Sequence, residues 1–181
     1  MIDEIMEYNR KFVENKGYEP YLTSKYPDKK LAILTCMDTR LLELLPAALG
    51  IKNGDAKIIK NAGGVIVHPY GSVVRSLLVG ILELGVEEVM VIGHTDCGVQ
   101  GMDGSEMLDM LVERGIDQQH IDIVRHSGID LGRRLGGFES VESSVHETVR
   151  RLKEHPLMPK DVRISGFIMD SATGELTRVE A

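Results

Sequence analysis

The sequence of 181 residues has little cysteine, no excess of positive charge and no long apolar run. Its only two cysteines are Cys36 and Cys97. In a chain without a secretion signal, a pair of cysteines is more typical of metal binding or thiol chemistry in a reducing compartment than of a disulfide. We therefore expect a cytoplasmic protein, and a disulfide between Cys36 and Cys97 is the less favoured alternative.

The lack of excess positive charge and of a long apolar run argues against nucleic acids and membranes as partners. There are 21 basic against 28 acidic residues, a net charge of -7, whereas nucleic-acid binding needs a basic surface that neutralises phosphates. Residues 1–15 mix charged and apolar side chains at helical spacing, so they lack the apolar core of a signal peptide. No other run approaches the length of a membrane span. We expect neither nucleic acid nor a membrane as a partner.

Apolar runs alternate with segments of helical periodicity along the whole chain. Nearly continuous runs, as at 31–35 and 89–93, indicate strands that are covered on both faces. The pattern predicts strands at 31–35, 57–62, 89–93 and 162–170, and helices at 3–15, 40–49, 72–84, 105–114 and 140–154. Strands that alternate with helices predict an α/β fold, with a mostly parallel central sheet and helices on both faces.

Several details of this fold can be predicted. The C-terminal "GELTRVE" reads as a last strand that pairs antiparallel with 162–169 at an edge of the sheet. Helix 72–84 is expected to be well buried, with Ser72 as its N-cap and Gly85 as its end. Residues 1–181 are expected to form one domain with an N-terminal helical arm at 1–27. The stretch 115–138 has mixed periodicity and is interpreted as a lid or an interface loop.

The two cysteines occupy similar positions after predicted strands. Cys36 follows 31–35, and both His94 and Cys97 follow 89–93. Ligands of parallel sheets bind beyond the carboxyl ends of the strands, so the three side chains converge if these strands are neighbours. Zinc accepts thiolate and imidazole ligands, and a catalytic zinc typically has three protein ligands and one open position. The fourth ligand is another histidine, a carboxylate or solvent, and Asp38 is the nearest candidate.

Asp38 and Arg40 follow Cys36 at a spacing that suggests how access to the fourth coordination position of the metal could be controlled. Arginine binds carboxylates in a two-pronged geometry, so Arg40 can keep Asp38 ionised and turned away from the metal. If the pair breaks, Asp38 could reach the metal and close the site. The simpler interpretation is a structural ion pair at a strand end. Residues 61–64 lack the lysine and the spacing of a phosphate-binding loop.

The motifs "CMDTR" and "GHTDCG", with "IKNAGG" between them, resemble those of the β-class carbonic anhydrases, in particular the short bacterial members. The resemblance implies a dimer as the minimum unit, with pockets at the subunit interface. The chain departs from the family at Lys60, where many members have arginine, at Gly64 and over 65–71. The resemblance implies a zinc site made by Cys36, His94 and Cys97, a catalytic dyad made by Asp38 and Arg40, and a pocket loop that contains Gly63 and Gly64.

The expected activity is the reversible hydration of CO2 to bicarbonate by a zinc-bound hydroxide, in a homodimer or a larger homo-oligomer. Since two thiolates offset the charge of zinc, the rate is expected to rise from neutral to alkaline pH. One alternative keeps the site and changes the substrate to carbonyl sulfide or carbon disulfide. A second is a non-catalytic zinc-binding regulatory protein with Asp38 as fourth ligand, and a third is a thiol enzyme. His68 is a conceivable proton shuttle.

Overall fold

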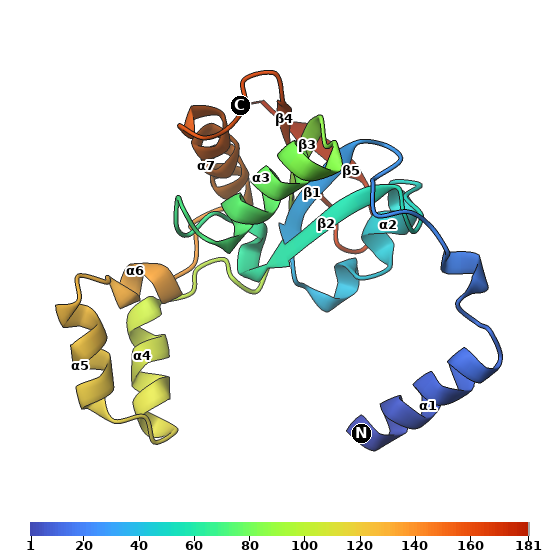
Figure 1. The fold of residues 1–181 in the computed structure, drawn as a ribbon. Helices are drawn as coiled ribbons and strands as arrows, with labels where there is room; N and C mark the ends of the chain where they lie inside the picture. The colour runs from blue at the N-terminus through green and yellow to red at the C-terminus, as the bar shows by residue number, and fades with distance from the viewer. Residues whose placement is uncertain (181) are drawn as a thin grey trace.

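A computed structural model describes residues 1–180, and its centre is one five-stranded sheet in the order β2-β1-β3-β4-β5 (Figure 1). The first four strands in this order are parallel, and β5 runs antiparallel to β4 at the edge. This confirms the predicted α/β fold and its antiparallel edge strand. The strands are β1 (Leu31–Cys36), β2 (Ala56–Asn61), β3 (Glu88–His94), β4 (Arg163–Met169) and β5 (Leu176–Val179).

Helices fill the connections between the strands and extend beyond them. Three single 3₁₀ turns, η1 (Glu19–Tyr21), η2 (Thr39–Leu41) and η3 (Ala62–Gly64), accompany the α-helices. The α-helices are α1 (Ile2–Glu14), α2 (Leu44–Ala48), α3 (Ser72–Leu84), α4 (Gly104–Glu113), α5 (Gln118–His126), α6 (Leu131–Leu135) and α7 (Val141–Glu154).

Two apolar clusters lie on opposite faces of the sheet. Because side chains of a strand alternate between faces, Ala32 and Leu34 point to one side of β1 and Ile33 to the other. The first cluster joins β1, β3 and β4 to α3 and α7, and the second joins them to η2 and α2. The prediction of helices on both faces is confirmed, and the strands between them are fixed on both sides.

The predicted helix over 40–49 is interrupted in the structure. Residues 39–41 form the 3₁₀ turn η2, and α2 begins only at Leu44. Pro46 then occupies the first turn of α2, where its missing N–H leaves no intrahelical hydrogen bond unmade. The short turn directly after β1 matters for function, because it carries Arg40 back towards the end of the strand.

Helix α3 corrects two predictions. Its N-cap is Gly71, so Ser72 is the first helical residue and not the cap. The helix buries Val74, Leu77 and Gly80, but Leu82 on its outer side is 68% exposed, so the helix is half-buried and not well buried. Gly85 ends it as predicted, in the left-handed conformation that favours glycine.

The stretch 115–138 is largely helical and contains α5 and α6. Asp117 and Asp130 cap these helices by accepting hydrogen bonds from the backbone N–H groups of Gln119 and Arg133. Together with α4 they form the α4–α6 lobe (residues 104–135), which projects from the sheet on the side opposite to α1 (Figure 1). The interpretation of 115–138 as a loop is therefore wrong for most of its length.

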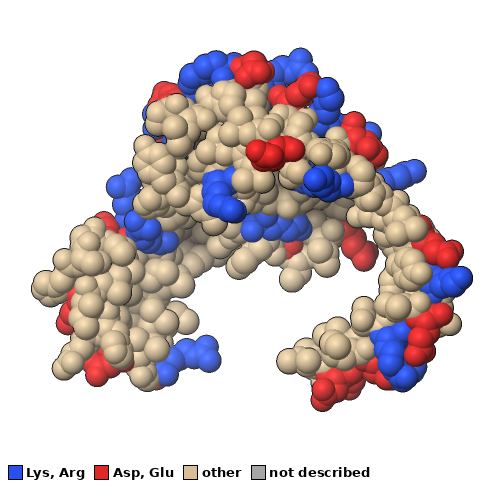
Figure 2. Space-filling view, in the orientation of Figure 1, with Lys and Arg blue, Asp and Glu red and all other residues tan. Residues whose placement is uncertain are grey.

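Charges of both signs share the surface of the molecule. On the face shown in Figure 2, acidic and basic side chains alternate along the arm that carries α1, and the α4–α6 lobe shows few charges. Within residues 1–180 we find no helix with the length and apolar character that crossing a bilayer requires.

Candidate metal centre

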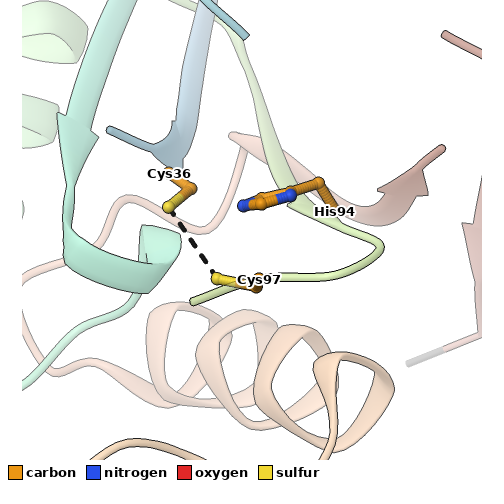
Figure 3. A group of neighbouring side chains, drawn as sticks. All are labelled: Cys36, His94 and Cys97. Carbon is orange, nitrogen blue, oxygen red and sulfur yellow. Dashed lines mark hydrogen bonds between the residues drawn. The ribbon is translucent and has the colours of Figure 1, made fainter. Parts of the chain in front are cut away.

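The parallel pairing of β1 with β3 brings the two cysteine motifs together. Thr35 pairs with Ile92, so both strands end at the same edge of the sheet. Cys36 is the last residue of β1, His94 is the last of β3, and Cys97 lies on the turn that follows (Figure 3). All three side chains are buried, with exposed fractions of 4%, 1% and 6% respectively. The structure thus brings together the three predicted residues.

The spacing of the three side chains suits a metal ion. Their donor atoms lie within 4.8 Å of one another, and the two Sγ atoms are 3.9 Å apart. Two sulfurs at the zinc–thiolate distance of about 2.3 Å in a tetrahedral site lie about 3.8 Å apart. Both cysteines are free thiols. The cluster could therefore hold a metal without a large rearrangement of the strands.

His94 is oriented for coordination through Nε2. Its Nδ1 lies 2.9 Å from the carbonyl oxygen of Thr95, which fixes the proton on Nδ1 because a carbonyl can only accept. Nε2 is buried, points towards the two sulfurs and is without a hydrogen-bond partner among the described residues (Figure 3). A buried lone pair without a partner is costly. A carbonyl behind the imidazole of a ligating histidine is the usual support in metal sites.

The environment of Cys97 favours the protonated thiol when no metal is bound. Burial raises the pKa of Cys97, and the neighbouring Cys36 adds to the effect, while the backbone N–H of Val99 opposes it. A metal ion binds the thiolate, so it must displace the proton of Cys97. Metal binding at this cluster is therefore coupled to proton release.

We expect the apparent zinc affinity to rise with pH through the neutral range. Because the raised pKa keeps Cys97 protonated there, this thiol alone gives about a tenfold gain in affinity per pH unit. The affinity should stop rising with pH only above the pKa of the Cys97 thiol. Competition with a chromophoric chelator at several pH values measures the slope, and calorimetry in two buffers of different ionisation enthalpy counts the protons. An affinity that does not change with pH would contradict this picture of the cysteines.

Asp38 and Arg40 form the ion pair that their spacing suggests. Nε and Nη2 of Arg40 donate to the two carboxylate oxygens of Asp38 at 3.0 and 2.9 Å, and the backbone N–H of Arg40 donates to Oδ1 at 2.9 Å. The side-chain hydrogen bonds from Arg40 hold the pKa of Asp38 well below its usual range, although partial burial opposes them. Asp38 is therefore a carboxylate at any physiological pH.

The carboxylate lies beside the cysteine and histidine cluster. Its Oδ2 is 3.9 Å from Nε2 of His94, which has no hydrogen-bond partner within residues 1–180. A group bound at the cluster would thus meet the three buried donor atoms on one side and an ionised carboxylate nearby. The predicted proximity of Asp38 to the ligands is present in the structure.

The predicted pocket loop lies directly against the backbone of Cys36. Gly63 and Gly64 are buried and both have positive φ, at 82° and 65°. A Cβ on Gly64 would come within 3.0 Å of the backbone N of Cys36, and a Cβ on Gly63 would meet the ring of Phe138 at the same distance. The two glycines let the turn after β2 approach the cluster closely.

Of two other residues named from the sequence, Lys60 lies near this edge. The ammonium of Lys60 donates to the carbonyl of Leu41 at 3.1 Å, and burial lowers its pKa while the charges of Cys36 and Asp38 oppose this. His68 lies on an exposed loop with its ring against Tyr70. Lys60 thus contributes positive charge to the surroundings of the cluster.

One residue of the site was missed by sequence reasoning. Asp96, between His94 and Cys97, accepts a hydrogen bond from Nη1 of Arg40 at 2.8 Å. Its position inside the "HTDC" segment was the available sign, because an acidic residue there must lie near the residues that follow β1. Arg40 therefore contacts two carboxylates and not one.

Comparison with known proteins identifies relatives of this chain. The protein-family model "Carbonic anhydrase" matches residues 31–176. The protein "Putative carbonic anhydrase YvdA" of Bacillus subtilis is 51% identical over 175 residues, which cover 97% of this chain and 89% of that protein. A "Carbon disulfide hydrolase" of Acidithiobacillus thiooxidans is 31% identical over 158 residues, 82% of this chain and 76% of that protein.

The solved structures lead to the same group. The crystal structure of β-carbonic anhydrase isoform I from Trichomonas vaginalis is 34% identical and superposes with a TM-score of 0.88, covering 99% of this chain and 97% of that one. The family model spans strands β1 to β4 and both cysteine motifs, and it ends at the first residue of β5. The chain belongs to the β-carbonic anhydrase family, as one of its short bacterial-type members.

Proposed function

We propose that this protein is a zinc-dependent carbonic anhydrase that interconverts CO2 and bicarbonate, with Cys36, His94 and Cys97 as the protein ligands of the metal. The single observation that supports this most is the buried Nε2 of His94, which lacks a partner among the described residues and points at two sulfurs 3.9 Å apart. Two thiolates and an imidazole are ligands that zinc prefers. Three protein ligands leave a fourth position open.

The metal and the protein have separate roles in this proposal. Zinc would supply the Lewis acidity that makes a water molecule nucleophilic near neutral pH. Asp38 would accept a hydrogen bond from a water molecule at the open position and so orient that water towards CO2. Arg40 keeps Asp38 ionised and fixes both of its oxygens. Gly64 brings the turn after β2 against the backbone of Cys36, and this turn would border the position of the substrate.

The non-catalytic alternative, in which Asp38 permanently fills the fourth position, is less well supported. Both carboxylate oxygens of Asp38 accept hydrogen bonds from Arg40, and one also accepts from the backbone N–H of that residue. Coordination of a metal by Asp38 would compete with these charge-assisted hydrogen bonds. The arrangement therefore favours an open site. A thiol enzyme is also disfavoured, because the donor atoms of Cys36, His94 and Cys97 all lie within 4.8 Å of one another, so His94 can share a metal with both thiols instead of acting as the base of one.

One of the relatives supports a second class of substrate. The relative from Acidithiobacillus thiooxidans is named a carbon disulfide hydrolase and is 31% identical to this chain. Carbon disulfide and carbonyl sulfide are linear like CO2 and would be attacked at the same carbon. Hydrolysis of these two molecules is therefore the second candidate, at the same cluster.

We place the protein in the cytoplasm as a homodimer or larger homo-oligomer, with one domain (1–181) whose arm (1–27) contacts a second copy. Helix α1 has 13 residues and none of them is buried, whereas an isolated helix of this length is marginally stable in water. Its exposed apolar residues need a partner surface. They are Ile2, Ile5, Met6, Tyr8 and Val13. A mass of 20.0 kDa by light scattering, that of one chain, would contradict this assembly.

Stopped-flow hydration of CO2 tests the proposed activity directly. The protein is loaded with zinc, its metal content is verified on the same sample, and rates are measured from neutral to alkaline pH. We expect hydration that rises with pH and that exceeds the release of hydrogen sulfide from carbon disulfide under the same conditions. Sulfide release without CO2 hydration would favour the second candidate. No turnover of either substrate by the zinc-loaded protein would overturn the proposal.

A further inference from the structure

Asp96 occupies an unusual position in the turn that follows β3 and carries Cys97. It lies between His94 and Cys97 and has φ of 53°, in the left-handed region that residues other than glycine rarely adopt. Such conformations tend to persist where surrounding contacts hold them, often at functional sites. The side chain of Asp96 is 86% exposed, yet its Oδ2 is 2.8 Å from Nη1 of Arg40. Burial of the side chain therefore does not explain the positive φ of Asp96, whereas the contact with Arg40 does.

The guanidinium of Arg40 is held from two sides. Nε and Nη2 bind the carboxylate of Asp38, Nη1 binds the carboxylate of Asp96, and Nη2 also donates to the backbone carbonyl of Asp96 at 2.8 Å. The two carboxylates use different N–H groups, so they do not compete for the same donors. Arg40 therefore links the turn after β1, which follows Cys36, to the turn after β3, which carries Cys97.

This link bears on the fourth position of the metal centre. Oδ2 of Asp38 is only 3.9 Å from His94 Nε2, so a small rotation would bring the carboxylate to a metal at the cluster. Arg40 opposes that rotation, but its own side chain is 41% exposed and would be free to turn into solvent if only Asp38 held it. Asp96 is the second attachment that keeps the guanidinium in place.

We propose that Asp96 is a positioning residue that acts through Arg40 to keep Asp38 away from the metal, so that the fourth position stays open to substrate. This inference rests on the proposed metal centre. It assigns to Asp96 a role distinct from that of the three ligands, since the side chain of Asp96 acts through its ion pair with Arg40. Loss of its carboxylate should increase the fraction of molecules in which Asp38 occupies the fourth position.

The test uses binding of a small anion, thiocyanate, to the cobalt-substituted protein, because cobalt reports its fourth ligand in the visible spectrum. Only the open form binds the anion, so the apparent dissociation constant is the intrinsic one divided by the open fraction. Asp96→Asn removes the charge and keeps the left-handed backbone, which asparagine tolerates well. We expect the apparent affinity for thiocyanate to fall about two- to fivefold, the size that an exposed ion pair supports.

A double-mutant cycle separates this effect from simple electrostatics. Removing a negative charge near the metal would by itself strengthen anion binding, in every background. In an Asp38→Asn background there is no carboxylate to swing onto the metal, so Asp96→Asn should leave only that direct effect. We therefore compare the change in thiocyanate affinity that Asp96→Asn causes in the two backgrounds. The affinity should fall when Asp38 is present, and it should not fall when Asp38 is replaced by asparagine. Equal effects in the two backgrounds would overturn the proposal.

Controls keep the result interpretable. Asp109→Asn, on the exposed side of α4, removes one acidic charge away from the site and should leave the thiocyanate affinity unchanged. Asp96→Gly removes the side chain and relaxes the positive φ, so it should reproduce Asp96→Asn even if that variant folds poorly. If the unaltered protein takes up neither cobalt nor zinc, the metal centre itself is refuted and the role of Asp96 with it. If it binds metal but the cycle shows no coupling, only the role of Asp96 fails.

Discussion

Replacement of Cys97 by serine is expected to abolish tight zinc binding and, with it, CO2 hydration. A serine hydroxyl is a far weaker zinc ligand than a thiolate, and the cluster found in residues 1–180 offers three protein donors. Mutation of a residue that only hydrogen-bonds to a metal ligand typically lowers metal affinity by roughly 10–100-fold. Loss of the ligand Cys97 itself should lower the affinity for zinc by more than this. Zinc per chain after dialysis, and stopped-flow rates on the same sample, measure both losses.

Thr95→Ser is the matched control for that experiment. Thr95 lies in the same turn, next to His94, and its hydroxyl accepts a hydrogen bond from the backbone N–H of Ser171 at 3.0 Å. Serine retains this hydroxyl, so the variant should bind zinc and hydrate CO2 like the unaltered protein. Full zinc occupancy and activity in Cys97→Ser would show that the cluster does not hold the functional metal.

Substitution of Gly64 by alanine is expected to destabilise both the fold and the metal site. The Cβ would lie 2.9 Å from the backbone carbonyl carbon of Thr35 and 3.0 Å from the backbone N of Cys36, atoms that cannot move without shifting the end of β1. Positive φ costs a non-glycine residue about 1–2 kcal/mol, and overpacking adds typically about 1–3 kcal/mol. We expect the free energy of unfolding to fall by about 2–5 kcal/mol in total.

Gly50→Ala isolates the contribution of the backbone angle. Gly50 has φ of 63°, close to the 65° of Gly64, but a Cβ there would meet no atom within 4 Å. Its loss in stability should be limited to about 1–2 kcal/mol, with no change in zinc affinity. Denaturant unfolding of the metal-free variants, followed by zinc titration, compares the two. Equal losses at Gly50 and Gly64 would mean that close contact with Cys36 does not matter.

The convergence of Cys36, His94 and Cys97 could be predicted from the sequence because these residues follow strands. The apolar runs before Cys36 and His94 define two buried parallel strands, and the carboxyl ends of neighbouring parallel strands meet at one edge of a sheet. Only the adjacency of β1 and β3 had to be assumed, and the structure shows their direct pairing. The orientation of His94 could not be predicted, since it depends on the carbonyl of Thr95.

Features that depend on tertiary contacts or exposure were not predictable in the same way. Leu82 has the helical spacing of a core residue but is exposed, because nothing in residues 1–180 covers the outer side of α3. Asp96 is a polar residue in a turn, and no periodicity indicates that it contacts Arg40, which lies 56 residues earlier in the chain. By contrast, α5 and α6 could have been found, since Asp117 and Asp130 are N-cap residues in the sequence itself.

The central claim is that two cysteines and one histidine of this chain hold a zinc ion with an open fourth position. X-ray absorption at the zinc K-edge, on protein loaded with one zinc per chain, tests it most directly. We expect two sulfur neighbours at about 2.3 Å and a remaining shell of nitrogen and oxygen at about 2.0–2.1 Å. A shell without sulfur, or with a single sulfur, would contradict the assignment of Cys36 and Cys97 as ligands.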